Sequence, residues 1–131
     1  RYGVMHQNTF LQSPKLLDKY YADRRNPLVA FAGQMTGVEG YVESTASGYL
    51  AAVAMAAKVQ EREVPDFPKE TAIGALGQYV SDESIENFQP MNINFSIIAP
   101  LEKRIRKKAE KNLAIAARSL DVIDRLVAKG I

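Results

Sequence analysis

Three glycines follow one another closely in the segment 31–44, between a short apolar run and a stretch of small residues. They are Gly33, Gly37 and Gly40, with the polar residues Gln34 and Thr36 between the first two. A glycine turn that leads directly into a helix lets backbone N–H groups and the positive helix end face a ligand without side chains in the way. In open α/β sheets, nucleotide-type cofactors bind at such strand-turn-helix junctions. The spacing differs from the G-x-G-x-x-G fingerprint, so a purely structural bend is the alternative to the predicted cofactor site.

The positive charges are concentrated in the last part of the chain. Residues 1–100 hold 8 Lys and Arg against 11 Asp and Glu, whereas residues 101–131 hold 9 against 4. A segregated positive patch attracts polyanions such as RNA, although most charge runs are simply solvated helix faces. No aromatic residue is interleaved with these cations, which favours contacts to an RNA backbone over base stacking. The candidate RNA-binding residues are Lys103, Arg104, Arg106, Lys107, Lys108 and Lys111.

Composition excludes several kinds of chemistry. The chain has no cysteine and one histidine, His6, so thiolate metal sites, cysteine nucleophiles and multi-histidine metal sites are excluded, and we expect no metal. A lone histidine is more often structural than catalytic, although its ring could stack on a planar ligand. No apolar run reaches the ~18 residues needed to span a bilayer, which makes a cytoplasmic protein the default expectation.

Periodicity predicts a mixed but helix-rich α/β fold. The continuous apolar run 28–32 predicts a strand that is covered on both faces. Helical spacing predicts helices over 42–60 and from Pro68 to about residue 79. Side-chain amides alternate with apolar residues over 87–96, which predicts an extended segment with one buried face.

The last predicted helix is the clearest by pattern. Apolar residues recur every three or four positions from 105 to 127, and Gly130 follows as a stop signal. The pattern predicts an amphipathic helix whose apolar side packs inward. The expected buried stripe is Ile105, Ala109, Leu113, Ala116, Leu120, Ile123 and Val127.

Four blocks of the chain, in this order, resemble the C-terminal part of the TrmFO family, formerly called Gid. They are MHQNTFLQSPKLL (5–17), FAGQMTGVEGYVES (31–44), ETAIGAL (70–76) and NFQPMNINF (87–95). The second block is shared more loosely with the GidA/MnmG flavoproteins of tRNA modification, whereas the fourth favours TrmFO. Gln7 and Ser96 depart from the family pattern, where arginine and glycine are expected.

The resemblance implies a tRNA (uracil-5-)-methyltransferase that depends on FAD and folate. Methylenetetrahydrofolate would supply one carbon, the flavin would supply reducing equivalents, and NAD(P)H would reduce the flavin again, giving 5-methyluridine in the T loop of tRNA. The alternatives are a GidA/MnmG-type flavoprotein that modifies an anticodon uridine, and a non-catalytic RNA-binding module. Because the cysteines and the N-terminal dinucleotide fingerprint expected of the family are not in this chain, we expect a C-terminal fragment with no catalytic residue of its own, inactive alone and binding FAD weakly if at all.

The resemblance also implies a fold and a set of contacts. The expected fold is the C-terminal part of a Rossmann-like FAD-binding domain, with one or two strands and three to five helices. Residues 1–62 would form a strand-turn-helix flavin-binding part, and residues 63–131 a mainly helical part. An isolated fragment would expose strand edges, so a dimer or strand exchange is a further expectation. Along the flavin, mostly through backbone, would lie Gly33, Gln34, Thr36, Gly37, Val38, Glu39 and Gly40, with His6, Asn8 and Tyr41 beside the folate.

Overall fold

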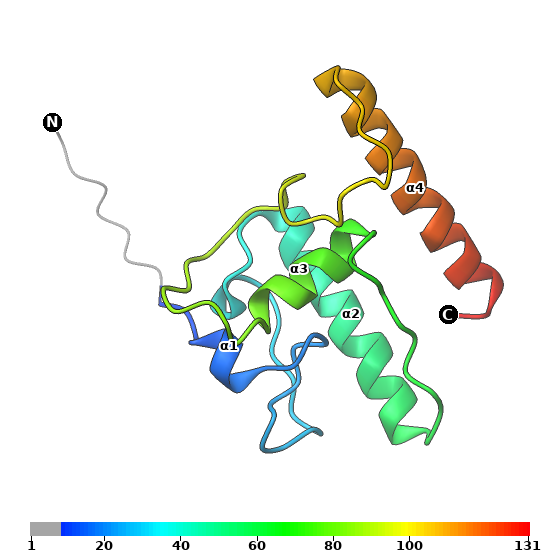
Figure 1. Cartoon of the computed structure of the whole chain (residues 1–131). Coiled ribbons are helices and arrows are strands. Elements are labelled where there is room, and N and C mark those ends of the chain that lie inside the picture. The colour runs from blue at the N-terminus through cyan, green and yellow to red at the C-terminus, as the bar shows by residue number, and fades with distance from the viewer. Residues whose placement is uncertain (1–8) are drawn as a thin grey trace, which may run out of the picture.

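Four α-helices organise the part of the chain that the computed structural model describes, residues 9–131. The short helix α1 and the 3-10 helix η1 precede the long helix α2, and α2 packs against α3 (Figure 1). The last helix, α4, lies along one side of the molecule. The bounds are α1 Ser13–Leu16, η1 Gln34–Thr36, α2 Tyr41–Val59, α3 Ala72–Val80 and α4 Lys108–Ala128. The helix-rich character predicted from the sequence is therefore confirmed.

The predicted strand over residues 28–32 is wrong. Residues 9–131 contain isolated bridges, such as Ala22 with Ala30, but no β-strand. Leu28 lies in a turn and is 67% exposed, because the chain folds back on residues 21–23 instead of entering a sheet. An apolar run forms a doubly covered strand only when neighbouring strands and helices cover it, and the described residues supply none. This also removes exposed strand edges as a reason to expect a dimer.

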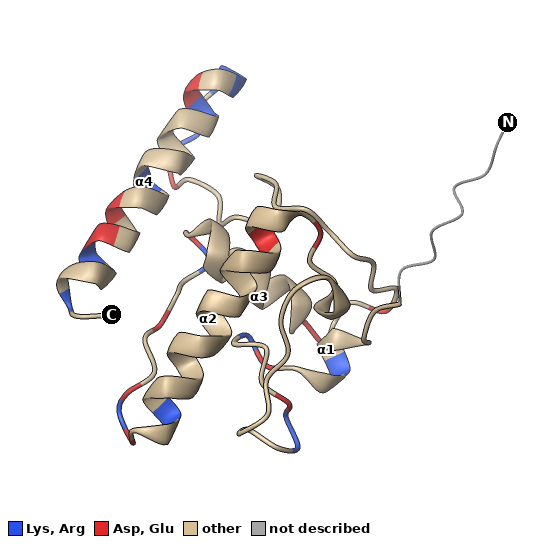
Figure 2. Ribbon diagram, turned by 180° about the vertical axis from the view of Figure 1, so that it is seen from behind, with Lys and Arg blue, Asp and Glu red and all other residues tan. Residues whose placement is uncertain are grey.

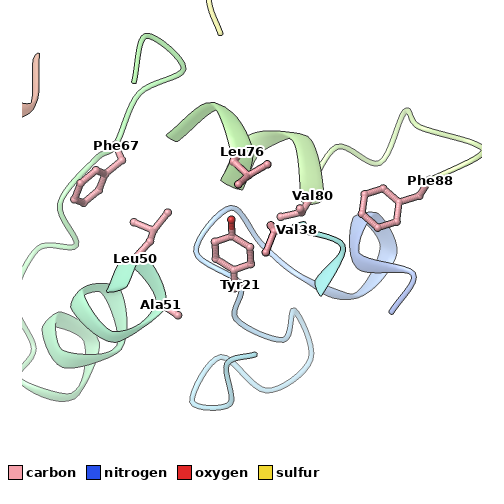
Figure 3. Close-up of a cluster of buried hydrophobic side chains, with 8 residues drawn as sticks. All are labelled: Tyr21, Val38, Leu50, Ala51, Phe67, Leu76, Val80 and Phe88. Atoms are coloured by element: carbon pink, nitrogen blue, oxygen red, sulfur yellow. The ribbon is translucent and has the colours of Figure 1, made fainter. Parts of the chain in front are cut away.

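The core joins segments that are far apart in the sequence. Tyr21, Val38, Leu50 and Leu76 are almost completely buried and come from an early loop, the glycine turn, α2 and α3 (Figure 3). Tyr21 has a positive φ of 63°, and burial raises the pKa of its hydroxyl well above the usual range. The glycine turn is thus held to the core by the buried side chain of Val38.

Helix α3 starts later than Pro68, the predicted first residue. Thr71 is the N-cap, and its hydroxyl accepts a hydrogen bond from Gly74 N at 3.0 Å while donating to Pro68 O at 2.8 Å. Gly74 is required here because a Cβ would lie 2.3 Å from the carbonyl oxygens of Phe67 and Pro68. The helix therefore begins where a side chain can satisfy its free N–H group.

Removing this cap should destabilise the chain. Thr71 is fully buried, so Thr71→Ala leaves the Gly74 N–H without its partner at a buried site. We expect a loss of about 1–2 kcal/mol in the free energy of unfolding, measured by urea denaturation. Thr71→Ser keeps the hydroxyl and should retain most of the stability; equal losses in the two variants would contradict the capping role.

Most of the apolar stripe of α4 is exposed, although Ile123 packs against the main core. Leu113 is 71% and Leu120 65% exposed, whereas Ile115 is buried against Ala75 and Ile98. Arg118 explains this orientation, because its guanidinium donates to the carbonyl oxygens of Ala99 and Pro100, the latter at 2.8 Å from Nη1. A second set of helically spaced positions around Ile115 therefore packs inward, and part of the predicted stripe stays at the surface.

Two further observations concern the same described residues. No helix within residues 9–131 combines the length and apolar character needed to cross a bilayer. In that part of the chain no three His, Asp or Glu side chains gather closely enough to hold a metal ion.

Candidate functional site

The three glycines of the turn all have positive φ angles, and their surroundings differ. The φ angles of Gly33, Gly37 and Gly40 are 75°, 89° and 100°. A Cβ on Gly33 would meet nothing closer than Ser44 Cβ at 3.8 Å, whereas a Cβ on Gly37 would lie 2.3 Å from Phe88 Cζ. The space at Gly37 is therefore filled by the chain's own aromatic ring.

A second segment, more than 50 residues further along the chain, forms one side of the turn. Met91 forms a parallel bridge with Val38, with Met91 N donating to Gly37 O at 3.0 Å and Glu39 N donating to Met91 O at 3.1 Å. The side-chain amide of Asn92 donates to Glu39 O at 3.0 Å. The glycine turn and the amide-rich segment thus form one unit. The sequence pattern of neither segment predicted this contact.

The amide-rich segment was predicted to be extended over residues 87–96, but it ends in a turn that begins at Phe95, and burial does not alternate over 94–96. Phe88 is buried and Asn92 is exposed. The Tyr79 hydroxyl donates to Gln89 O at 2.7 Å, and burial raises the pKa of that hydroxyl. This bond holds the start of the segment against α3.

Most backbone N–H groups in the turn are already used. Those of Gly33, Thr36, Gly37 and Glu39 donate to Ser47 Oγ, Gly33 O, Gln34 O and Met91 O respectively. The Thr36 hydroxyl also bonds Gly33 O at 2.7 Å, and the Ser13 hydroxyl donates to Thr36 O at 2.7 Å. These residues shape the turn, and Val38 belongs to the core, so Gln34 and Gly40 are the exposed members of the predicted flavin set.

The N-terminus of α2 is the open end of the site. Its N-cap, Gly40, has no side chain to cap the first turn, and Tyr41 and Val42 are largely exposed. The first N–H groups of a helix have no partner within the helix and carry its positive dipole end. Glu43 accepts from Ile93 N at 3.2 Å, which ties its carboxylate to the neighbouring segment. A Cβ on Gly40 would lie 2.2 Å from Glu43 Oε2, so this carboxylate lies over Gly40 and disfavours an anionic ligand there, whereas Tyr41 is open to a planar ring.

The folate candidates are only partly described. Tyr41 is 95% exposed and stands at the first position of α2, free to stack on a planar ring. His6 and Asn8 lie outside the described residues.

The structure brings four of the six candidate RNA-binding cations together. Arg104, Arg106, Lys108 and Lys111 line a hollow of about 660 Å³ where the chain enters α4. Figure 2 shows Lys and Arg positions at that end of α4. Lys103 and Lys107 are not among its lining residues, and Lys107 pairs with Glu110 at 3.2 Å. Phe95 lines the same hollow, which the spacing of residues in the sequence did not indicate.

Comparison with known proteins decides the family. The family described as Glucose inhibited division protein A (GIDA) matches residues 1–63. The methylenetetrahydrofolate–tRNA-(uracil-5-)-methyltransferase TrmFO of Acetivibrio thermocellus is 51% identical over 129 residues, which is 98% of this chain and 30% of that protein. The TrmFO proteins of Bacillus cereus and Natranaerobius thermophilus are 53% and 50% identical over 97% and 98% of the chain, covering 29% and 30% of their own lengths. The chain belongs to the TrmFO family. It spans about 30% of the length of these curated relatives.

The four blocks that resemble TrmFO lie close together, since Val38, Leu76 and Phe88 of three of them share one core cluster. Leu11 N donates to Met35 O at 2.8 Å, so the described part of the first block packs on the second, and Met91 and Asn92 of the fourth block bond the turn as well. The resemblance stated from these blocks is confirmed. Sequence reasoning missed the contacts of Phe88 with Gly37 and of Asn92 with Glu39, because nothing in residue spacing links segments this far apart.

Proposed function

We propose that this chain is part of a folate- and FAD-dependent tRNA methyltransferase that forms 5-methyluridine in the T loop of tRNA. The observation that carries the proposal is the identity of about 50% to TrmFO proteins along nearly the whole chain. The substrates would be methylenetetrahydrofolate and tRNA, with NAD(P)H as reductant. Because tRNA is the substrate, we place this activity in the cytoplasm.

The residues at the glycine turn fit a flavin. The N-terminus of a 19-residue helix has no side-chain cap and would present its positive dipole end, partly offset by the Glu43 carboxylate, to the polar edge of a flavin ring. Gln34 and Gly40 are exposed toward solvent, while Gly33, Thr36, Gly37, Val38 and Glu39 support the turn through the hydrogen bonds and core contacts described above. When bound, the flavin supplies the reducing equivalents, and the protein groups hold and orient it.

The remaining substrates are assigned to neighbouring surfaces. Tyr41, whose ring is exposed to solvent, would stack on the pterin of the folate, and the other proposed folate contacts, His6 and Asn8, lie outside the described residues. The cations near the start of α4 contact the tRNA backbone. No residue of this chain is assigned as the catalytic nucleophile, since it has no cysteine, and the remaining 70% of a TrmFO-length protein would supply it.

The proposal includes the parent fold. In a full-length protein, residues 1–62 would form the turn-and-helix part of a Rossmann-like flavin domain, and residues 63–131 a mainly helical part. The exposed run around Leu28 would be covered there. Any dimer of the isolated chain stays a proposal as well.

The deciding experiment uses a full-length protein that contains this segment. We expect the purified protein to show flavin absorbance and to form 5-methyluridine in unmodified tRNA when methylenetetrahydrofolate and NADPH or NADH are added. A modified anticodon uridine in place of 5-methyluridine would favour a GidA/MnmG-type enzyme. If the protein contains no flavin and forms no modified nucleoside, the proposal is overturned. The alternative is then the RNA-binding module, which the basic hollow favours.

A further inference from the structure

Two hollows meet at Phe95. This residue lines both the basic hollow described above and a second hollow of about 320 Å³. The second hollow is almost entirely apolar. It is lined by Ala72, Ile93, Asn94, Phe95, Ile98, Ile115, Ala116, Ser119 and Leu120.

The basic hollow is arranged to take phosphate groups. The ion pairs found within residues 9–131 do not include Arg104, Arg106, Lys108 or Lys111. Lys107, the N-cap of α4, provides no capping side-chain hydrogen bond, so the positive end of a 21-residue helix adds to the field of the cations. Clustered arginines and lysines beside a helix N-terminus favour phosphate.

The apolar hollow is arranged to take a flat, uncharged ring. Phe95 is 45% exposed, which leaves part of its ring free for stacking. Leu120, an exposed member of the stripe predicted to be buried, lines the same hollow. An aromatic ring beside clustered cations is the usual construction for binding single-stranded nucleic acid, because bases stack while cations hold the backbone.

The position of Phe95 connects the hollows with the glycine turn. Ile93 N donates to Glu43 in the first turn of α2, and Phe95 follows two residues later. Phe95 lies in a turn, so the two residues from Ile93 to Phe95 span at most about 7 Å, the length of extended chain. A nucleotide held at Phe95 would therefore lie near the end of α2 proposed to face the flavin.

We propose that the two hollows bind one unpaired nucleotide of an RNA strand. Its base stacks on Phe95 in the apolar hollow, and its flanking phosphates lie among Arg104, Arg106, Lys108 and Lys111. This deepens, and rests on, the proposed tRNA substrate. It replaces backbone-only contact, which was predicted from the lack of aromatic residues among the cations, with combined base and backbone contact.

The test measures binding of this chain to fluorescently labelled oligouridylate by anisotropy, with no flavin or folate present. Phe95→Leu keeps an apolar side chain but removes the aromatic face. We expect it to weaken oligouridylate binding about tenfold and to leave binding to an abasic RNA backbone of the same length unchanged. The circular dichroism spectrum checks that the variant is folded.

Charge variants separate the phosphate contacts from general attraction. Arg104→Gln with Arg106→Gln should weaken binding to both RNAs and flatten the salt dependence, with the slope falling by about 0.7 per lost phosphate contact. The matched control, Arg62→Gln with Lys129→Gln, removes the same charge from a different hollow and should change binding less. Equal losses in both double variants would reduce the site to nonspecific attraction and overturn the proposal.

The outcomes distinguish this site from the proposed enzyme. Unchanged oligouridylate binding by Phe95→Leu, or equally tight binding of an RNA duplex, overturns the nucleotide site even if the full-length protein forms 5-methyluridine. If Phe95→Leu binds oligouridylate more weakly but the full-length protein forms no 5-methyluridine, the nucleotide site is supported. The proposed methyltransferase activity is then overturned.

Discussion

Gly37→Ala should lower the free energy of unfolding of this chain far more than Gly33→Ala does. The new Cβ would lie 2.3 Å from Phe88 Cζ and 2.5 Å from Cε1, and the φ angle of 89° is unfavourable for alanine. Backbone strain of about 1–2 kcal/mol adds to an overpacking cost of about 1–3 kcal/mol. We expect a total loss of about 2–5 kcal/mol in the free energy of unfolding, measured by urea denaturation.

Gly33→Ala is the control, because it carries backbone strain without a collision. The nearest atom to its Cβ, Ser44 Cβ, lies at 3.8 Å. Shortening Phe88 to leucine should recover part of the loss at Gly37 and none at Gly33, giving a coupling energy of about 1 kcal/mol or more in a double-mutant cycle. If Gly37→Ala costs no more than Gly33→Ala and Phe88→Leu recovers nothing, the contact with Phe88 does not hold the turn.

The same contact affects how flavin measurements should be interpreted. A bulky residue at Gly37 would displace Phe88 and, with it, the segment that bonds Glu39. Flavin loss in such a variant would follow from disturbed packing even if no ligand touched Gly37. Variants at exposed positions therefore test the proposed cofactor site more directly.

Tyr41→Ala should impair folate use without affecting the fold. In a full-length protein containing this segment, we expect kcat/KM for methylenetetrahydrofolate to fall about tenfold or more, since stacking of a planar ring contributes about 1–3 kcal/mol. Tyr41 is exposed, so the free energy of unfolding should change by no more than about 0.5 kcal/mol. The measurement is 5-methyluridine formation as a function of folate concentration, together with the flavin absorbance of each variant.

Tyr49→Ala provides the matched control on the same helix. Tyr49 is also exposed on α2, about two helical turns after Tyr41. Its replacement by alanine should leave folate use unchanged. Tyr41→Phe keeps the ring and should retain most of the activity. Equal activity in Tyr41→Ala and the unchanged protein would remove Tyr41 from the folate site.

Sequence patterns alone predicted the local elements whose stability comes from nearby residues. The helix after the glycine turn, the helix before the amide-rich segment and the long C-terminal helix all form, because helical spacing and glycine stop signals act within a few residues. The pattern over residues 87–96 did not predict the turn that begins at Phe95. The family resemblance followed from the four blocks, and identities of about 50% to TrmFO proteins agree with it.

Burial was harder to predict because it depends on what packs against each element. The apolar run at residues 28–32 has strand composition yet lies in a loop, since its pairing with residues 21–23 is limited to one isolated bridge and two flanking hydrogen bonds. The last helix has two apolar faces at helical spacing, and the hydrogen bonds of Arg118 to Ala99 and Pro100 select the one that packs. Local pattern cannot distinguish two such faces.

The sequence by itself determined that three glycines lead into a helix and that cations gather before the last one. Only the tertiary structure decided which side chains surround the glycines and the cations. It filled the space at Gly37 with Phe88, left the start of α2 open at Tyr41, and brought Phe95 to cations that have no aromatic neighbour in the sequence. The physical reason is that backbone conformation and charge are local properties, whereas a ligand-sized space is defined by side chains from distant segments.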